Sequence, residues 1–303
     1  MKIAYLILAH SQPILFKRLL KSLEYKDDCF FVHIDLKTDI SQFKDSDLKN
    51  IFFLSKRIKV NHAAFSQVWA MISLIKAALK KGEFDYFIFL SGVDYPIQSP
   101  AKIHRFFEEN QGMNFIDFYQ YSGESADNFH FSKVYNEDYV LGSPKIVSLI
   151  FRAIFRLARI LLPRRTFLKD MNLYRGSTSW CLHKQSVEYI IQFLDSTKSK
   201  TIFKFLKYAF SPDEMLFQTI LLNSPFAKNC NFYEKNKGSS NNILTVENKA
   251  YLHYIDWSPE REDPAILNET DFARIKASKY FFARKFDEKK SARLLDQIDN
   301  YLL

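Results

Sequence analysis

Apolar residues in the first 120 positions form short uninterrupted runs, and segments with helical spacing separate these runs. The runs predict buried strands at Ile3–Ala9, Cys29–Ile34, 51–54, 86–90 and 113–116. Apolar residues three and four positions apart predict helices over 13–23, 65–79 and 101–109. This alternation is typical of a doubly wound α/β fold, in which helices flank a mainly parallel sheet.

The second half of the chain contains more helical patterns and fewer strand patterns. Helices are expected over 186–194, 202–209, 266–276 and 292–302, and the polar stretch 232–250 is expected to be a surface loop or a lid. The pattern is interrupted neither by an internal repeat nor by a linker long enough to separate two domains. We therefore expect residues 1–303 to form a single large domain.

Residues 145–165 form a distinct segment, in which apolar positions are interleaved with arginines at helical spacing. A basic amphipathic helix of this kind can make peripheral contact with an anionic membrane. The same pattern also fits a helix that packs on the domain and keeps its arginines in solvent. The sequence leaves both interpretations open.

The composition is that of a globular protein, with 47% hydrophobic and 25% charged residues. A formal net charge of +9 favours anionic partners, but no nucleic-acid-binding motif is found, so we expect no nucleic acid partner. Three scattered cysteines fit a reducing compartment, and the apolar run at the N-terminus is too short for an anchor. We expect a cytoplasmic protein, with attachment to the inner face of the membrane if 145–165 binds lipid.

Arg284 and Lys285 are adjacent cations within the aromatic stretch Phe-Phe-Ala-Arg-Lys-Phe-Asp, at 281–287. Arginine offers a planar fork and lysine a point charge, and both bind phosphate oxygens strongly. The pair therefore predicts a site for a diphosphate. The alternative is a strand end whose basic side chains extend into solvent.

Several polar residues follow predicted strands, where the ligands of doubly wound sheets bind. Asp35 can bond a ribose hydroxyl or a uracil edge, or can serve only as a turn residue. Asp94 lies in a turn with Gly and Pro, and can contact a donor sugar or cap that turn. His10 and His33 are ambiguous, and we interpret His33 as a structural hydrogen-bonding group.

The segment Ser211-Pro212-Asp213-Glu214 precedes an apolar helical pattern. Ser211 is the expected N-cap, and Pro212 the first helical residue. Glu214 would then be held rigidly in the first turn, which suits a general base. The alternative for Glu214 is a capping-box role, and we interpret Asp213 as structural.

We expect no metal, because the histidines and cysteines have no metal-ligand spacing. Asp45-Ser46-Asp47 is the one Asp-x-Asp sequence, the pattern that often holds a divalent cation after a strand. It precedes a predicted strand and lies in a polar stretch, so we interpret it as solvated surface.

Eight short segments together resemble the core-2/I-branching β-1,6-N-acetylglucosaminyltransferase family, which includes the protein xylosyltransferases and bacterial relatives. They occur in the family's order over nearly the whole chain: Tyr5-Leu6-Ile7-Leu8-Ala9-His10, His33-Ile34-Asp35, His62-Ala63-Ala64-Phe65-Ser66-Gln67-Val68, Leu90-Ser91-Gly92-Val93-Asp94-Tyr95-Pro96-Ile97, Gly176-Ser177-Thr178-Ser179-Trp180, Ser211-Pro212-Asp213-Glu214, Tyr254-Ile255-Asp256-Trp257 and Phe282-Ala283-Arg284-Lys285-Phe286. Each segment alone is weak, but their joint order is a strong signal.

The resemblance implies a GT-A-like fold, inversion at the sugar carbon, a UDP-sugar donor and no required metal. Residues 1–120 would form the nucleotide-sugar-binding half, and 121–303 the acceptor and catalytic half. By position in the motifs, the roles implied are nucleotide contacts for Leu8, His10, Asp35, Val60 and His62, diphosphate contacts for Arg284 and Lys285, the catalytic base for Glu214, and the donor–acceptor junction for Thr178, Ser179 and Trp180, with Asp94 near the donor sugar.

Two departures from the family pattern leave the donor sugar open. His62-Ala63-Ala64 stands where the family often has Trp-Gly-Gly, and Ser179 replaces the first Trp of a bacterial Trp-Trp pair. The resemblance implies transfer of a sugar, with GlcNAc expected and xylose as the alternative, to a glycan or glycolipid hydroxyl. A non-catalytic sugar-nucleotide- or glycan-binding protein on the same fold is the competing class.

Overall fold

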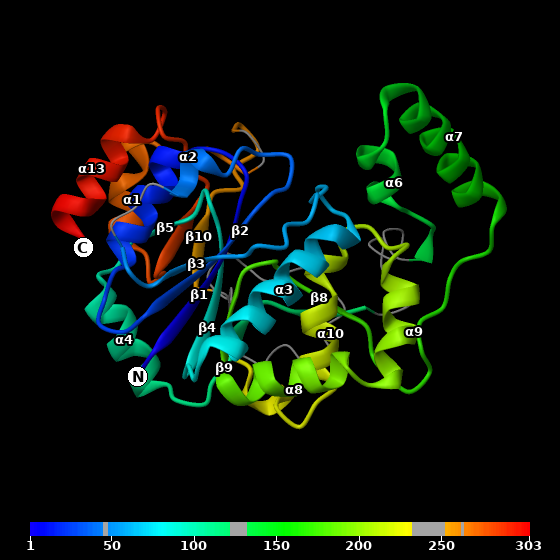
Figure 1. The fold of residues 1–303 in the computed structure, drawn as a ribbon, viewed down its shortest axis with the longest axis horizontal. Coiled ribbons are helices and arrows are strands. Elements are labelled where there is room, and N and C mark those ends of the chain that lie inside the picture. Colours follow the sequence, from blue (N-terminus) through cyan, green and yellow to red (C-terminus); the bar gives the residue numbers. More distant parts are fainter. Residues whose placement is uncertain (45–47, 122–131, 232–251, 262–263) are drawn as a thin grey trace.

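A six-stranded sheet forms the centre of the computed structural model, which describes residues 1–44, 48–121, 132–231, 252–261 and 264–303 (Figure 1). In spatial order its strands are β3 (Ile51–Phe53), β2 (Cys29–Ile34), β1 (Ile3–Ala9), β4 (Tyr86–Ser91), β9 (Trp180–His183) and β6 (Phe115–Ile116). The first four strands run parallel, and β9 is antiparallel to both β4 and β6. The expected α/β fold with a mainly parallel sheet is confirmed.

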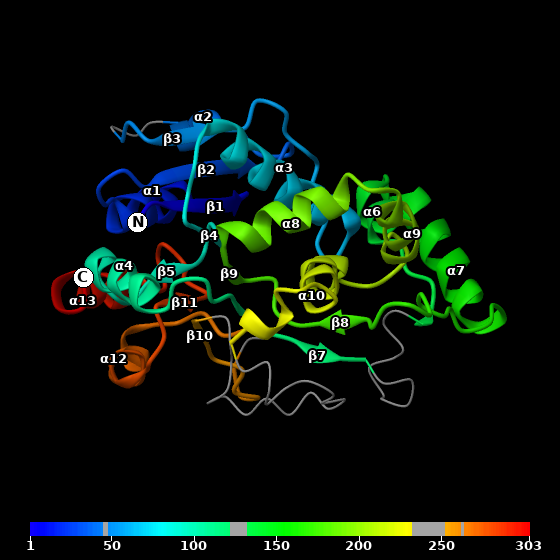
Figure 2. The same ribbon diagram turned by 90° about the horizontal axis from the view of Figure 1, so that it is seen from below.

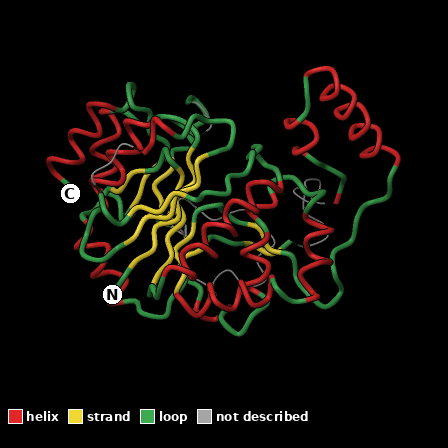
Figure 3. Tube along the Cα trace, viewed as in Figure 1, coloured by secondary structure: helices red, strands yellow, loops and turns green. Residues whose placement is uncertain are grey.

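Helices cover both faces of this sheet, which explains the continuous apolar runs (Figure 3). Leu6, Phe31 and Phe89 belong to one core cluster, with α3 (Phe65–Lys81), α8 (Lys184–Leu194) and α10 (Leu216–Leu222). Residues that alternate with them, such as Ile7 and Val32, belong to a second cluster with α1 (Pro13–Leu23), α4 (Pro100–Glu109) and α13 (Ala292–Tyr301).

The strand order reverses at β1, and this reversal positions the site. The chain passes from β1 to β2 and β3 on one side, then returns with β4 on the other. Gly92 lies in the turn after β4, and its N–H donates to the Leu8 carbonyl at 2.9 Å. A Cβ on Gly92 would lie 2.7 Å from the Ala9 Cβ, so only glycine lets this turn approach the end of β1 so closely.

Two small sheets pair strands that lie far apart in the sequence. In the first, β11 (Phe282–Arg284) pairs in parallel with β10 (His253–Ile255) and antiparallel with β5 (Tyr95–Pro96). The second joins β7 (Tyr119–Gln120) to β8 (Tyr174–Arg175). Figure 2 shows β5, β10 and β11 together beneath the main sheet.

The helices of the second half differ from the sequence predictions mainly at their ends. The helix predicted over 202–209 is α9 (Thr197–Leu206), which begins five residues earlier. The helix predicted over 266–276 was wrong in its first part. Asn268 and Asp271 form a capping box around the 3₁₀ turn Glu269–Asp271, so α12 starts only at Phe272 and ends at Ala277.

The basic segment folds as α7 (Lys145–Leu161), which follows the short helix α6 (Glu137–Gly142). Both views place this pair at the periphery, away from the central sheet (Figures 1 and 2). In the described part of the chain, α7 buries none of its residues. No helix among the described residues is both long and apolar enough to cross a bilayer.

Two sequence predictions fall outside the described residues. These are Asp45-Ser46-Asp47 as solvated surface and the stretch 232–250 as a loop or lid. The remaining elements are α2 (Ser41–Lys44) and the 3₁₀ turns Pro212–Glu214 and Ala227–Asn229.

Candidate active site

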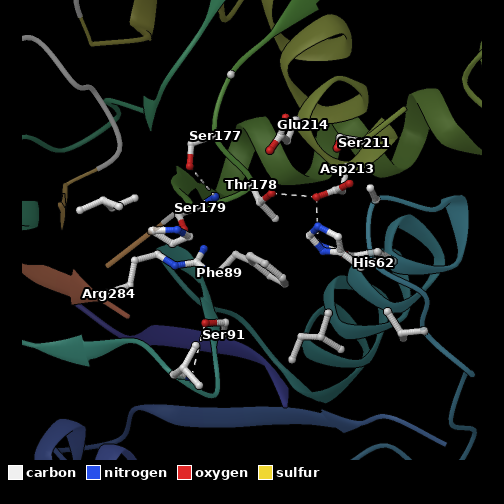
Figure 4. Close-up of a pocket in the computed structure, with 18 of the residues that line it drawn as sticks. His62, Phe89, Ser91, Ser177, Thr178, Ser179, Ser211, Asp213, Glu214 and Arg284 are labelled. Atoms are coloured by element: carbon white, nitrogen blue, oxygen red, sulfur yellow. Dashed lines mark hydrogen bonds between the residues drawn. The ribbon is translucent and has the colours of Figure 1, made fainter. Parts of the chain in front are cut away.

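A cavity of about 890 Å³ opens at the carboxyl ends of β1 and β4. This is the edge where ligands of doubly wound sheets bind. Most of the sequence-predicted site residues line it: Leu8, His10, Asp35, Val60, His62, Thr178, Ser179, Glu214 and Arg284. Figure 4 labels the last five of these from His62 onwards. The volume lies within the range usual for small-molecule sites.

Asp35 and Lys37 join two segments of the cavity wall. Asp35 is buried at the end of β2, and its Oδ1 accepts a hydrogen bond from the Lys37 N–H at 2.9 Å. The Lys37 ammonium lies 3.4 Å from Asp35 Oδ2 and donates to the Val60 carbonyl at 2.5 Å. The carboxylate therefore sits at the predicted place, with a cation beside it.

The histidines of the motifs have different environments. His10 and His62 line the cavity and are exposed. His33 is buried, and its Nε2 accepts a hydrogen bond from the Ile58 N–H at 2.8 Å. Burial lowers the pKa of His33, which favours the neutral ring that can accept this bond. His33 thus has the structural role that we inferred from sequence.

Glu214 reaches the cavity from the opposite wall and is paired with an arginine. Arg175 donates from Nε and Nη2 to Glu214 Oε2, at 2.9 and 2.7 Å. Glu214 is 29% exposed and Arg175 16% exposed at the side chain, so the pair is only partly screened by solvent. The negative charge of Glu214 raises the pKa of Arg175 against the opposing effect of burial.

The backbone around Glu214 is fixed in a way that the sequence did not reveal. The expected N-cap was wrong: Ser211 has φ 52° and its side chain makes no capping hydrogen bond. A single 3₁₀ turn, Pro212–Glu214, follows it, and α10 begins only at Leu216. The Gly176 N–H donates to the Glu214 carbonyl at 2.9 Å. This bond ties the carboxylate-bearing turn to the strand that carries Arg175.

Asp213 also lines the cavity, and it connects three segments of the chain. Its Oδ2 accepts hydrogen bonds from Gln67 Nε2 at 2.9 Å and from Thr178 Oγ1 at 2.7 Å. Its Oδ1 is buried and has no hydrogen-bond partner among the described residues. Burial, followed by the adjacent negative charge of Glu214, raises the pKa of Asp213 to about 7. These contacts agree with the structural role inferred for Asp213.

Asp94 supports Arg284 from beneath the cavity and does not line it. It is fully buried, and it accepts hydrogen bonds from the Ser91 N–H and hydroxyl, both at 2.7 Å. Its Oδ1 lies 3.5 Å from Arg284 Nε, and its Oδ2 lies 3.6 Å from His253 Nε2. Burial alone would raise the pKa of Asp94, but Arg284, His253 and Ser91 outweigh it and hold the pKa below its ordinary value. Of the two roles considered for Asp94, these contacts match the turn cap.

Trp180 and Lys285 also lie outside the cavity lining. Trp180 is fully buried in β9, where its ring stacks on Phe89 at 5.6 Å and contacts Phe217 at 5.4 Å. Strand pairing turns the Trp180 side chain towards α10, so this residue belongs to the core and not to the predicted donor–acceptor junction. Lys285 is half-buried beside Arg284.

The lining also includes residues that the sequence predictions did not assign to the site, among them Arg175, Gln67, Tyr119 and Trp257. Arg175 immediately precedes the Gly176 motif, and Gln67 and Trp257 lie inside quoted motifs, so their positions carried a signal. Tyr119 carried none. Within the described ranges, no three His, Cys, Asp or Glu residues are grouped to hold a metal ion.

Comparison with known proteins places this geometry in a family. Curated relatives include xylosyltransferase 2 of Bos taurus, 25% identical over 99% of this chain, and xylosyltransferase 1 of Mus musculus, 24% identical over 99%. The matches cover 33% and 30% of those proteins, so the chain spans about a third of their length.

Among solved structures, the likeness is weak. A 4-diphosphocytidyl-2C-methyl-D-erythritol synthase from Anaerococcus prevotii matches 69% of this chain and 85% of its own, with 11% identity and a TM-score of 0.31. Residues 1–349 of S. aureus TarS match 74% and 73%, with 13% identity and a TM-score of 0.27.

The model of the Core-2/I-branching enzyme family matches residues 3–276. That match includes every sequence-predicted site residue except Arg284 and Lys285, which lie beyond its end at residue 276. The chain therefore belongs to the Core-2/I-branching enzyme family of glycosyltransferases.

Proposed function

We propose that this chain is an inverting, metal-independent glycosyltransferase that moves a sugar from a UDP-sugar to a hydroxyl of a glycan or glycoconjugate. One observation carries the proposal: Glu214 and Arg284 line the same cavity, at the carboxyl edge of the sheet. Figure 4 shows them on opposite sides of the open space. A base and a cation that face each other across a cavity suit a reaction that removes a proton on one side and releases an anion on the other.

In the proposed reaction, Glu214 acts as the general base. Oε2 of Glu214 is bound by Arg175, and Oε1 accepts the proton of the acceptor hydroxyl. The acceptor oxygen then forms a bond to the anomeric carbon from the face opposite the diphosphate. The bond between that carbon and the diphosphate oxygen breaks, and UDP departs with the electron pair, so the sugar carbon is inverted.

The leaving UDP gains negative charge, and Arg284 is the residue that neutralises it. Its guanidinium reaches the cavity while Asp94 fixes it from behind. A preorganised cation of this kind stabilises charge without reorganisation at the moment of reaction. Lys285 contributes a second charge in the proposal, from its position next to Arg284.

The donor that we propose is UDP-GlcNAc, which the family resemblance implies. UDP-xylose is the second candidate, favoured by the xylosyltransferase relatives that match 99% of the chain. A protein that only binds a sugar nucleotide is the third class. The joint presence of Glu214 and Arg284 in one cavity favours catalysis over binding alone.

A donor screen tests the proposal. UDP release from UDP-GlcNAc, UDP-xylose and other UDP-sugars is measured with EDTA present, and with and without a mixture of glycan acceptors. We expect UDP-GlcNAc to give the fastest release and EDTA to have no effect. Release from UDP-xylose alone would show that xylose, and not GlcNAc, is the donor sugar. Activity only with added manganese would overturn the metal-independent mechanism. Binding of every UDP-sugar without UDP release would favour the non-catalytic class.

A further inference from the structure

Helix α7 presents a large apolar face that the rest of the described chain leaves uncovered. The face consists of side chains at successive helical turns: Ile146, Leu149, Ile150, Leu157, Ile160 and Leu161. Ile146 is 76% exposed, Ile160 71% and Leu161 69%. A globular protein rarely leaves so many large apolar residues side by side in water without a partner for them.

One aromatic residue of α7, Phe151, contacts the neighbouring helix α6. Phe151 and Phe155 are half-buried, and the Phe151 ring lies 5.2 Å from that of Tyr139 in α6. The Arg159 guanidinium lies 4.7 Å from the Tyr135 ring centroid. These contacts fix the orientation of α7 on α6 and on the segment before it, and the apolar face is directed away from them.

A basic stripe borders the apolar face. Lys145, Arg152 and Arg156 recur at seven- and four-residue steps, so they lie along one line of the helix, and all three are exposed. The helix contains no Asp or Glu. This charge pattern favours an anionic surface, because an apolar protein partner alone would give no reason for a one-sided row of cations.

Helix α6, on which α7 packs, is hydrogen-bonded to the wall of the cavity. Asp138 in α6 accepts hydrogen bonds from Asn61 Nδ2 at 3.0 Å and from the Ser66 N–H at 2.9 Å. Lys59 Nζ donates to the Gly142 carbonyl at 2.8 Å. These contacts join the base of α7 to the segment that carries His62, so whatever α7 binds is held near the cavity.

We propose that α7 is a docking helix for an anionic lipid bilayer. Its apolar face enters the boundary between headgroups and acyl chains, and the basic stripe binds lipid phosphates at the level of the headgroups. The helix lies in the plane of the surface, and the cavity is held beside that surface. This binding is independent of the sugar-transfer chemistry, so it can be tested without any substrate.

Flotation of the full chain with lipid vesicles tests the proposal. One set of vesicles contains phosphatidylglycerol and phosphatidylcholine in equal amounts, and the other contains phosphatidylcholine alone. We expect binding to the first set to exceed binding to the second by at least about tenfold. Raised salt should weaken the binding, because the lipid and the stripe attract by charge.

Two double variants separate the two parts of the surface. Ile150→Asp with Leu157→Asp changes exposed positions of the apolar face, so folding should survive while vesicle binding falls at least about tenfold. Lys145→Gln with Arg156→Gln should reduce binding to anionic vesicles about fivefold for each charge removed. Thermal unfolding of each variant verifies that the fold is intact.

The matched control is Lys21→Gln with Lys80→Gln, which removes the same charge from exposed positions on α1 and α3. It should bind vesicles like the wild-type chain. Equal binding by both vesicle types, or equal loss in the control and the stripe variant, would overturn the proposal. So would sedimentation showing that the apolar face joins two copies of the chain while vesicles remain unbound.

Discussion

Arg175 holds Glu214 by one oxygen and leaves the other available. Both hydrogen bonds from the guanidinium, from Nε and Nη2, end on Oε2, and Oε1 accepts no hydrogen bond from the described residues. The carboxylate therefore has a fixed plane and one unoccupied oxygen at a cavity that also receives Arg284. A positioned acceptor for a proton is what an inverting transfer requires at the acceptor side.

Glu214→Gln should abolish most of the sugar transfer, because the amide keeps the shape of the side chain but cannot take the proton. We expect kcat to fall by about 10²–10⁴-fold, with affinity for UDP unchanged. Steady-state kinetics and calorimetric UDP titration measure the two quantities. Glu24→Gln, at an exposed position of the chain, is the control. Transfer at the wild-type rate by Glu214→Gln would remove this residue from the mechanism.

Arg175→Gln should lower kcat by about tenfold to a hundredfold, because Glu214 loses the two bonds that orient it. KM for the donor should change little, since Arg175 acts through Glu214. Arg175→Lys keeps the charge but lacks the planar fork, so its kcat should lie between those of wild type and Arg175→Gln. A larger effect on donor KM than on kcat would indicate that Arg175 contacts the donor directly.

Arg284→Ala and Lys285→Ala should each lower turnover by about 10²–10³-fold, because the leaving diphosphate loses a cation. Arg284→Ala also leaves buried Asp94 without its neighbour, so Arg284→Lys is needed as a variant that keeps the charge. Thermal unfolding verifies the fold, and Lys289→Ala, at an exposed position, is the control. Donor hydrolysis and transfer at wild-type rates in both alanine variants would refute the assignment.

Gly176→Ala should destabilise the protein by about 1–3 kcal/mol and reduce transfer. A Cβ at this position would lie 1.7 Å from the Asp117 carbonyl oxygen, so the strand must move, and the bond from Gly176 to Glu214 must move with it. Chemical denaturation measures the free energy of unfolding. Gly82→Ala is the matched control, because a Cβ there meets nothing within 4 Å. Equal stability of the two variants would contradict the close packing at Gly176.

Asp213→Asn should change the pH dependence of stability. The folded protein raises the pKa of Asp213 to about 7, so it binds this proton more tightly than the unfolded chain. The resulting stability is present below the ordinary carboxyl pKa and is lost as pH rises towards 7. Wild type should therefore lose more free energy of unfolding than Asp213→Asn between about pH 4 and pH 7. Parallel pH profiles for the two proteins would show that Asp213 is ionised throughout.

The fold class could be predicted because strands that are buried on both faces have continuous apolar sequences. Ile3–Ala9 and Cys29–Ile34 appear in the structure with the predicted bounds. The small sheet of β5, β10 and β11 could not be predicted, because two- and three-residue strands carry no periodic signal. The Ser211 cap was predicted from a common local pattern, and tertiary contacts override it by placing that residue at positive φ.

The candidate site was only partly accessible from the sequence. Motif order brought residues such as Asp35 and Glu214 together, and both line one cavity. The pairing of Arg175 with Glu214 spans 39 positions and depends on how β8 meets the 3₁₀ turn, which no local pattern encodes. Trp180 shows the opposite case, since a residue within a functional motif serves the core. Motifs identify segments, whereas packing decides which side chains face the ligand.

The position of β9 between β4 and β6 has a consequence for dissecting the chain. Residues 180–183 close the sheet that residues 1–120 begin, so a fragment ending at 120 would expose the hydrogen-bonding edge of β4 and the apolar surfaces beside it. Such a truncated product would tend to aggregate. During synthesis, well over half of the polypeptide must also leave the ribosome before the sheet that residues 1–120 begin can be completed.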